Sequence, residues 1–191
     1  DYCAAGCWTE AASLWNVAIA EDSVTPMTYY YLGWCLVQGK LSGAEQAFAD
    51  AAGACPDYCF PNRLEAILAL QCAMEQNPND AKAPYYLGNL YYDKRQYDLA
   101  LEAWETSAGL DDKFPTIWRN LALANFNKKD EEATAIEYME RAFQLDTTDA
   151  RGLMELDQLY KRVRRPHSER LAFLQQYPEL IAQRDDLVLE E

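Results

Sequence analysis

Residues 85–112 read YYLGNLYYDKRQYDLALEAWETSAGLDD, and this stretch contains two patterns that recur along the chain. The first pattern is a Leu-Gly pair among aromatic residues, Leu87-Gly88. The second is a small–large–small stripe followed by a residue that tends to end a helix, here called a breaker: Ala100–Trp104–Ser107–Asp112. Steps of four and then three residues place the stripe on one face of a helix. The stretch therefore predicts two consecutive helices that pack a bulky side chain between small ones.

The stripe occurs five times, as Ala11–Trp15–Ala18–Ser23, Ala44–Phe48–Ala51–Pro56, Ala66–Leu70–Ala73–Pro78, Ala100–Trp104–Ser107–Asp112 and Ala135–Met139–Ala142–Thr147. Its breakers stand 33, 22, 34 and 35 residues apart. The Leu-Gly pattern precedes three of the stripes, as Leu32-Gly33, Leu87-Gly88 and Leu121-Ala122. Glycine inside a helix costs about 1 kcal/mol. We therefore expect a close contact at Gly88 that compensates for this cost.

These motifs resemble the tetratricopeptide repeat, W-x2-L-G-x2-Y…A-x3-F…P with a period near 34. The resemblance implies an all-α, right-handed helical solenoid of antiparallel helix pairs. First helices would line a concave groove, and second helices would form the outer wall. The 22-residue step has room for one helix only, at about residues 61–76, so we expect one irregular half-repeat near residues 57–78.

The repeats predict a single solenoid domain over residues 1–191. It divides into repeats in 1–56, the half-repeat in 57–78, two regular repeats in 79–147, and a C-terminal repeat with a cap in 148–191. Residues 1–8 are interpreted as the tail of a first helix, which makes the chain a fragment of a longer protein. At the other end we expect a first helix in 149–163, a shorter partner in 168–176 and a polar terminal segment in 178–189.

Three stretches resemble a narrower group, residues 85–94, 114–121 and 169–174. They are similar to the C-terminal tetratricopeptide region of large bacterial proteins, in which a β-rich domain of unknown function precedes the repeats and the genes indicate carbohydrate metabolism. This resemblance implies an alternative role for the chain. It would be a structural extension of a carbohydrate-related enzyme and would pack against its own upstream domain.

The net charge is −14, from 31 acidic and 17 basic residues. Such a surface repels phosphate backbones, which argues against a nucleic-acid partner. The acids either keep a helical surface soluble or steer a basic partner. The one basic cluster, residues 161–165, either complements the end of a helix or contacts an acidic partner. No apolar run reaches about 18 residues, so we expect no membrane span.

Six cysteines and one histidine, His167, show no paired spacing suited to zinc. We expect small reduced thiols buried in helix cores, with disulfides as the alternative. Reduced thiols indicate a reducing compartment, and hence the cytoplasm. The sequence shows no nucleophile with a base, no metal cluster and no paired carboxylates in a pocket. We therefore expect neither catalysis nor a cofactor in this chain, whereas the activity of its parent is left open.

A non-catalytic module that binds a protein or peptide is the preferred interpretation. The groove-facing candidates on first helices are Tyr85, Asn89, Tyr92, Asp93, Arg119, Asn120, Asn127 and Arg151, together with Thr116, Leu123, Glu155 and Gln158. Tyr30 and Tyr97 are further candidates for the groove. The residues assigned to the core are Trp15, Trp104, Trp118, Tyr91 and Tyr160.

One sharper interpretation is capture of a partner's C-terminal carboxylate, which some tetratricopeptide domains achieve with two asparagines and several bases. By resemblance, Asn89, Asn120 and Arg151 match three of the five positions. Tyr85 and Glu155 occupy the places of two bases, which removes charge-assisted hydrogen bonds worth about 1.5–3 kcal/mol each. Binding of an extended peptide or a partner domain is therefore preferred.

Overall fold

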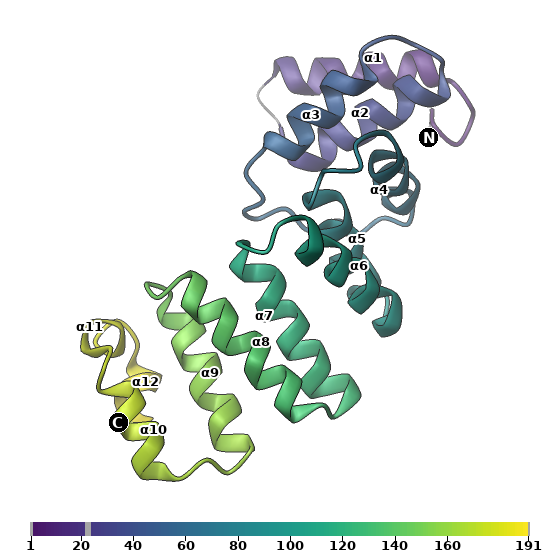
Figure 1. The fold of residues 1–191 in the computed structure, drawn as a ribbon. Coiled ribbons are helices and arrows are strands. Elements are labelled where there is room, and N and C mark those ends of the chain that lie inside the picture. Colours follow the sequence, from purple (N-terminus) through teal and green to yellow (C-terminus); the bar gives the residue numbers. More distant parts are fainter. Residues whose placement is uncertain (1, 22–23, 191) are drawn as a thin grey trace. The chain divides into compact units, whose positions relative to one another are not determined.

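The computed structural model describes residues 2–21 and 24–190, and every regular element within them is a helix (Figure 1). The predicted all-α class is confirmed. The chain divides into two compact units, Asp1–Asp111 and Asp112–Glu191. A continuous stack through residues 1–191 stays a prediction. In the described residues, no helix combines the length and the apolar content that crossing a membrane requires.

The first unit contains the helices α1 (Trp8–Ala20), α2 (Pro26–Gln38), α3 (Ala44–Gly53), α4 (Glu65–Gln76), α5 (Lys82–Asp93) and α6 (Tyr97–Leu110). Helix α2 pairs with α3, and α5 pairs with α6. Helix α4 has no such partner and packs against α2 and α5 instead. This single helix confirms the half-repeat that the 22-residue step predicts.

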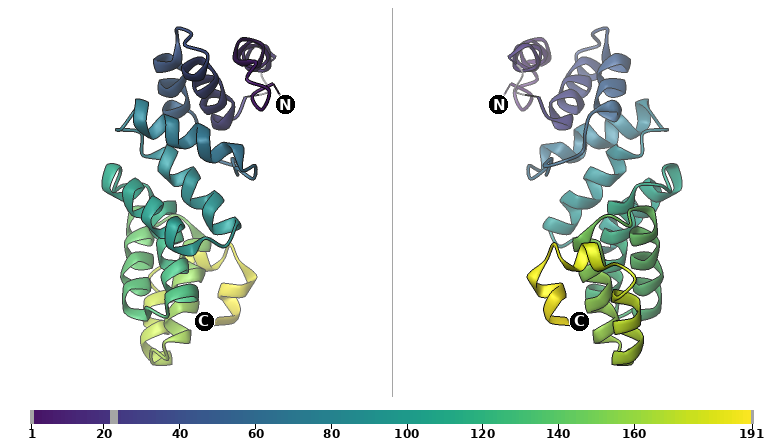
Figure 2. Two further views of the ribbon diagram at one scale, coloured as in Figure 1. Left: turned by 90° about the vertical axis from the view of Figure 1, so that its right-hand side faces the viewer. Right: turned by 90° about the vertical axis from the view of Figure 1, so that its left-hand side faces the viewer.

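The second unit contains α7 (Pro115–Ala124), the short π-helical turn η1 (Asn125–Lys129), α8 (Glu132–Leu145), α9 (Ala150–Arg162), α10 (His167–Leu174), α11 (Pro178–Ile181) and α12 (Asp185–Glu190). Helix α7 pairs with α8, and α9 packs against both α8 and α10. Figure 2 shows α7, α8 and α9 side by side from two further directions.

Helix boundaries follow the breakers. Helices α3, α4, α6 and α8 end two or three residues before Pro56, Pro78, Asp112 and Thr147. The fifth breaker, Ser23, lies outside the described residues. Proline stands at the first position of α2 and α7, where a helix does not need the missing N–H. The predicted stops are therefore confirmed at the four breakers that the structure describes.

The large side chains of the second helices pack directly against the small residues of the first helices. A Cβ built on Gly88 would lie 2.5 Å from Cδ1 of Trp104, and a Cβ on Gly33 would lie 2.6 Å from Cε1 of Phe48. Both distances are shorter than any ordinary carbon–carbon contact. The corresponding residues of the next pair, Ala122 and Met139, are both fully buried. The close contact predicted at Gly88 is thus confirmed.

Tyr30 lies in the core of the first unit, so its expected place in a groove is wrong. Its side chain is fully buried, and its hydroxyl donates to Oδ2 of Asp80 at 2.7 Å. The other oxygen of Asp80 accepts from the backbone N–H of Lys82 at 2.8 Å. Burial, followed by the charge and hydrogen bond of Asp80, raises the pKa of Tyr30 far above its ordinary value. The neutral hydroxyl therefore ties α2 to the start of α5.

The core of the second unit confirms the predicted stripe of α9, since Leu153, Leu156, Leu159 and Tyr160 are buried. The expected polar terminal segment is wrong in part. Helices α11 and α12 add buried apolar side chains to this core, namely Leu180, Ile181 and Leu187. A buried ion pair also joins α9 to α10: Nε of Arg170 donates to Oδ1 of Asp157 at 2.9 Å, and Nη2 donates to Oδ2. Two acids, Asp157 and Asp80, are buried and therefore neither keep the surface soluble nor steer a partner.

The N-terminal segment differs from its prediction. Residues 2–7 form turns, in which the N–H of Cys7 donates to the carbonyl of Tyr2 at 2.9 Å, and α1 begins at Trp8. Gly6 has a φ of +72°, which side-chain-bearing residues rarely adopt and which is incompatible with a helix tail.

Two further assignments are corrected. Trp15 and Tyr91 are half-buried instead of buried, whereas Trp104, Trp118 and Tyr160 are in the core as predicted. The cysteines do not all lie in helix cores. Cys35, Cys59 and Cys72 are buried, but Cys3 and Cys7 are half-buried and Cys55 is exposed.

Candidate functional site

Consecutive first helices of the second unit, α7 and α9, bring three of the candidate residues into one ion cluster, which consists of Arg119, Arg151 and Glu155. Nε and Nη2 of Arg119 on α7 donate to the two carboxylate oxygens of Glu155 on α9. Nε of Arg151, one turn before Glu155, donates to Oε1 of the same carboxylate at 2.9 Å. The bidentate pair fixes the orientation of Arg119 and also strengthens its attraction to the carboxylate of Glu155.

The members of the ion cluster differ in burial. The side chains of Arg119 and Glu155 are 21% and 14% exposed, whereas that of Arg151 is 63% exposed. Burial acts to raise the pKa of Glu155, but the hydrogen bonds and charges of Arg119 and then Arg151 outweigh it and lower the pKa below its ordinary value. Glu155 is therefore ionised at neutral pH, and Arg151 is the member most accessible to a partner.

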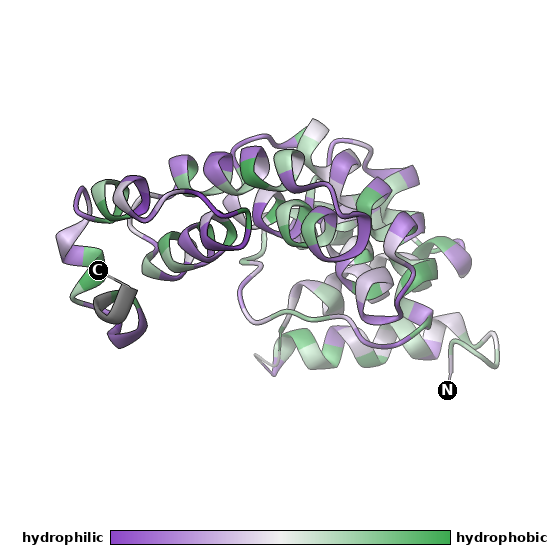
Figure 3. Ribbon diagram, turned by 90° about the horizontal axis from the view of Figure 1, so that it is seen from below, coloured by the Kyte–Doolittle hydropathy of each residue, from purple (hydrophilic) through white to green (hydrophobic). Residues whose placement is uncertain are grey.

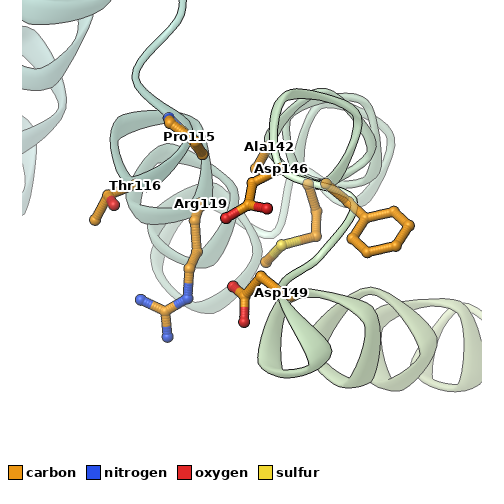
Figure 4. A pocket seen from close by; sticks show the side chains of 9 residues that line it. Pro115, Thr116, Arg119, Ala142, Asp146 and Asp149 are labelled. Carbon is orange, nitrogen blue, oxygen red and sulfur yellow. The ribbon is translucent and has the colours of Figure 1, made fainter. Parts of the chain in front are cut away.

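A pocket of about 90 Å³ adjoins the ion cluster and shares Arg119 with it. Its lining comprises Pro115, Thr116, Arg119, Met139, Ala142, Phe143, Asp146, Asp149 and Gly152. In Figure 4, Asp146 and Asp149, from the connection between α8 and α9, lie beside the stem of Arg119 on α7, and the guanidinium group points away from them. Apolar walls with two carboxylates at the edge can receive the stem and the charged head of a basic side chain.

Both carboxylates of the pocket have local partners. Oδ1 of Asp146 accepts from the backbone N–H of Thr148 at 3.0 Å, and Oδ1 of Asp149 accepts from the N–H of Arg151 at 2.9 Å. Asp149 is the N-cap of α9, and an aspartate before an apolar helix is a recognisable signal for that role. Neither acid is among the sequence candidates, because no pattern in the sequence indicates that the cap also borders a pocket.

The candidates on α5 in the first unit serve mainly to hold Trp104. Its Nε1 donates to Oδ1 of Asn89 at 3.1 Å and lies 3.3 Å from the carbonyl of Tyr85. Tyr85 is only 6% exposed and packs against the ring of Tyr86, so its placement on a binding surface is wrong. The ring of Tyr92 packs against Tyr97 and Trp104, with centroids 5.2 and 5.5 Å away.

The remaining candidates are more scattered. Asp93 is exposed and binds Lys94 at 2.7 Å. On α7, Asn120 is half-buried and Leu123 packs against the core of the second unit. Asn127 is exposed on η1, where the side chain of the buried Asn125 donates to the carbonyl of Leu121 at 2.8 Å and supports the widened turn.

Replacing Glu155 by Gln is expected to lower the free energy of unfolding at neutral pH by about 1 kcal/mol, because two cations lose their anion. The folded-state pKa of Glu155 lies below the ordinary value of 4.5, so this stabilisation is present above that pH and is lost as the pH falls through the folded-state pKa. Urea unfolding of both proteins at about pH 7 and about pH 3 measures it. An equal difference at the two pH values would contradict the ion cluster.

The profile of the tetratricopeptide repeat matches residues 1–58, 62–111 and 85–150, which together cover more than half of the chain. Among solved structures, MamA 41-end from Desulfovibrio magneticus RS-1 is 18% identical with a TM-score of 0.55, and the match covers 96% of this chain and 91% of that one. The pilF protein of Pseudomonas aeruginosa is 18% identical with a TM-score of 0.53, and the match covers 95% of this chain and 71% of that one. At these identities the likeness shows the fold, and with the profile it confirms the predicted class of helix-pair solenoid. The chain belongs to the tetratricopeptide repeat family.

Proposed function

We propose that this chain is a non-catalytic interaction module that binds a peptide or a partner domain on the first-helix surface of its second unit. Proteins of the family generally act as scaffolds for other proteins. The observation that carries the proposal is the ion cluster beside the pocket, on two consecutive first helices. The core stripe does not use these polar side chains, so they are available to order a polypeptide laid across α7 and α9.

The ion cluster favours a particular kind of partner. Glu155 already accepts hydrogen bonds from both arginines, so a partner's terminal carboxylate would have to displace it. An extended segment that carries a basic side chain fits better, because Asp146 and Asp149 border the pocket and the chain has a net charge of −14. Complementary charge of this kind mainly raises specificity and the association rate.

Replacing Asp146 and Asp149 together by Asn is expected to weaken binding of the partner about tenfold or more, because the pocket loses the two carboxylates that would receive the basic side chain and hydrogen bonds to charged groups contribute about 1.5–3 kcal/mol each. The partner would be recovered from extracts of the source cell on the immobilised wild-type chain. Its affinity for purified wild-type and variant chains would then be measured by titration calorimetry.

The matched control is Glu137→Gln, which removes one exposed acid from the second helix α8. This control should bind the partner as the wild-type chain does. The surface assignment fails if the double variant keeps its affinity, or if the control loses as much affinity as the double variant while circular dichroism shows all three chains folded.

A second candidate function is supported by the outer face of α1. Leu14 and Val17 are 54% and 52% exposed, and Tyr2 is 49% exposed. They border a hollow of about 300 Å³, and Figure 3 shows apolar residues along this helix nearest the N-terminus. Such a face fits the alternative in which the chain packs against another domain of a larger carbohydrate-related protein. Size-exclusion chromatography tests this alternative. That domain would be mixed either with the wild-type chain or with the double variant Leu14→Ser and Val17→Ser, and only the wild-type chain should co-elute with it.

A further inference from the structure

The N-terminal turns and helix α2 bring two thiols together. Sγ of Cys3 lies 3.5 Å from Sγ of Cys35, although the residues are 32 positions apart in the sequence. Cys35 is fully buried in α2, and Cys3 is half-buried in the turns of residues 2–7. Since a disulfide has a sulfur–sulfur distance of about 2.05 Å, the two atoms need to approach by only about 1.5 Å, which is within reach of side-chain rotation.

A neighbouring contact holds the start of α1, which directly follows the N-terminal turns, against α2. The ring of Trp8, the first residue of α1, packs edge-on against Trp34 with a centroid distance of 5.3 Å. Trp8 also lies against Gly39, on which a built Cβ would be 3.0 Å from Cβ of Trp8. The approach of Cys3 to Cys35 is thus supported by contacts of Trp8 with Trp34 in α2 and with Gly39, the residue that follows α2.

The other nearby thiol is directed elsewhere. Sγ of Cys7 lies 3.9 Å from the backbone carbonyl of Ala5. The turn that contains Cys3 and Cys7 is closed by a hydrogen bond from the N–H of Cys7 to the carbonyl of Tyr2 at 2.9 Å. This arrangement favours Cys35 over Cys7 as the partner of Cys3.

We propose that Cys3 and Cys35 form a reversible disulfide that fastens residues 2–7 to α2. The oxidant would be a low-molecular-weight disulfide such as oxidised glutathione. The Cys3 thiolate attacks one glutathione sulfur, forms a mixed disulfide and releases one reduced glutathione. Cys35 then loses its proton, its sulfur attacks Sγ of Cys3, and the second glutathione leaves as a thiolate that takes up the proton. In sum, two protein thiols and one glutathione disulfide yield one protein disulfide and two reduced glutathione molecules.

The burial of the two thiols sets this order of steps. Burial, followed by the hydrogen bond and charge of Cys3, raises the pKa of Cys35 to about 12. Cys35 is therefore a thiol near neutral pH, and its position under the N-terminal turns keeps it from solution oxidants. Cys3 is the more accessible sulfur and meets the oxidant first.

The bond would close a loop from residue 3 to residue 35, which contains α1 and most of α2. A closed loop of this size restricts the unfolded chain and stabilises the folded one. The disulfide would also hold Tyr2 and the turns beside the exposed face of α1 in one arrangement. The proposal does not depend on the binding surface of the second unit.

The test exposes the full 191-residue chain to oxidised glutathione and then blocks the remaining thiols before mass spectrometry. We expect the mass of the unblocked chain to fall by about two units on oxidation. Four cysteines should then react with the blocking reagent, and digestion should yield a linked peptide pair that contains Cys3 and Cys35. The melting temperature of the oxidised chain should exceed that of the reduced chain by about 5 °C or more.

The control variants are Cys3→Ser, which changes a half-buried residue, and Cys55→Ser, which changes an exposed one. Cys55→Ser should show the same linked peptides and the same rise in melting temperature, whereas Cys3→Ser should show neither. A link between Cys3 and Cys7, a chain that carries only mixed glutathione adducts, or an equal rise in the Cys3→Ser variant would overturn the proposal.

Discussion

Replacing Gly88 by Leu is expected to lower the free energy of unfolding of the first unit by about 3 kcal/mol. A Cβ at this position would already lie 2.5 Å from both Cδ1 and Nε1 of Trp104, before the rest of the leucine side chain is placed. Trp104 cannot move aside freely, because it is 3% exposed and its indole N–H donates to Asn89. Thermal and urea unfolding, followed by circular dichroism, would measure the loss.

Gly109 provides the matched control on α6. It is also a helical glycine, but outside its chain neighbours and the backbone of its own helix no described atom lies within 4 Å of the Cβ that a substitution would add. Gly109→Leu should therefore be neutral or stabilise the chain by up to about 1 kcal/mol, which is the gain in helix propensity. Losses of equal size in the two variants would show that the effect is not specific to the contact with Trp104.

Replacing Arg170 by Met is expected to lower the free energy of unfolding of the second unit by about 3–5 kcal/mol. The side chains of Arg170 and Asp157 are 7% and 1% exposed, so the change leaves the carboxylate of Asp157 buried without its cation. The double change Arg170→Met and Asp157→Leu removes both charges and should recover most of the lost stability. Urea unfolding of the wild-type chain, the single variant and the double variant measures both effects.

An exposed ion pair serves as the control for these variants of the buried pair. Arg184 and Asp186 make a similar two-bond contact, with side chains 33% and 50% exposed. Arg184→Met should leave the unfolding midpoint almost unchanged, because water replaces the lost partner. If Arg170→Met were equally harmless, the buried pair would not be a structural tie between α9 and α10.

The helices and their pairing could be predicted because one packing rule repeats along the chain. Each stripe places a large residue between small ones, and the contacts of Phe48 with Gly33 and of Trp104 with Gly88 show that rule directly. The half-repeat was also predictable, since a 22-residue step has no room for a second helix.

Side-chain placement near the half-repeat was less predictable. Helix α4 inserts against α2 and α5, where the repeat offers no template. Tyr30 and Tyr85 each stand in a run of tyrosines on one of those two helices, and both proved to be buried. In such runs, residue type does not indicate which aromatic ring faces inward.

The buried charges were missed for a different reason. Asp157 follows Leu153 by four residues and lies in the apolar register of α9, which is a signal that an acid occupies a core position. Its partner, Arg170, lies beyond a connector on another helix, so periodicity within α9 cannot identify it. In the candidate site, the likeness to repeat positions located Arg119, Arg151 and Glu155 individually. Their mutual pairing, and hence the ion cluster, required the structure.

Photo-crosslinking tests the central claim, a polypeptide bound across α7 and α9, most directly. A photoreactive amino acid would replace Asn127 or Arg151 on the first-helix side, and Glu137 or Arg141 on the second helix α8, before irradiation in extracts of the source cell. All four positions are exposed. We expect one shared polypeptide adduct at Asn127 and Arg151 and none at the two positions on α8. Adducts on α8 alone, or the same weak background at all four positions, would contradict it.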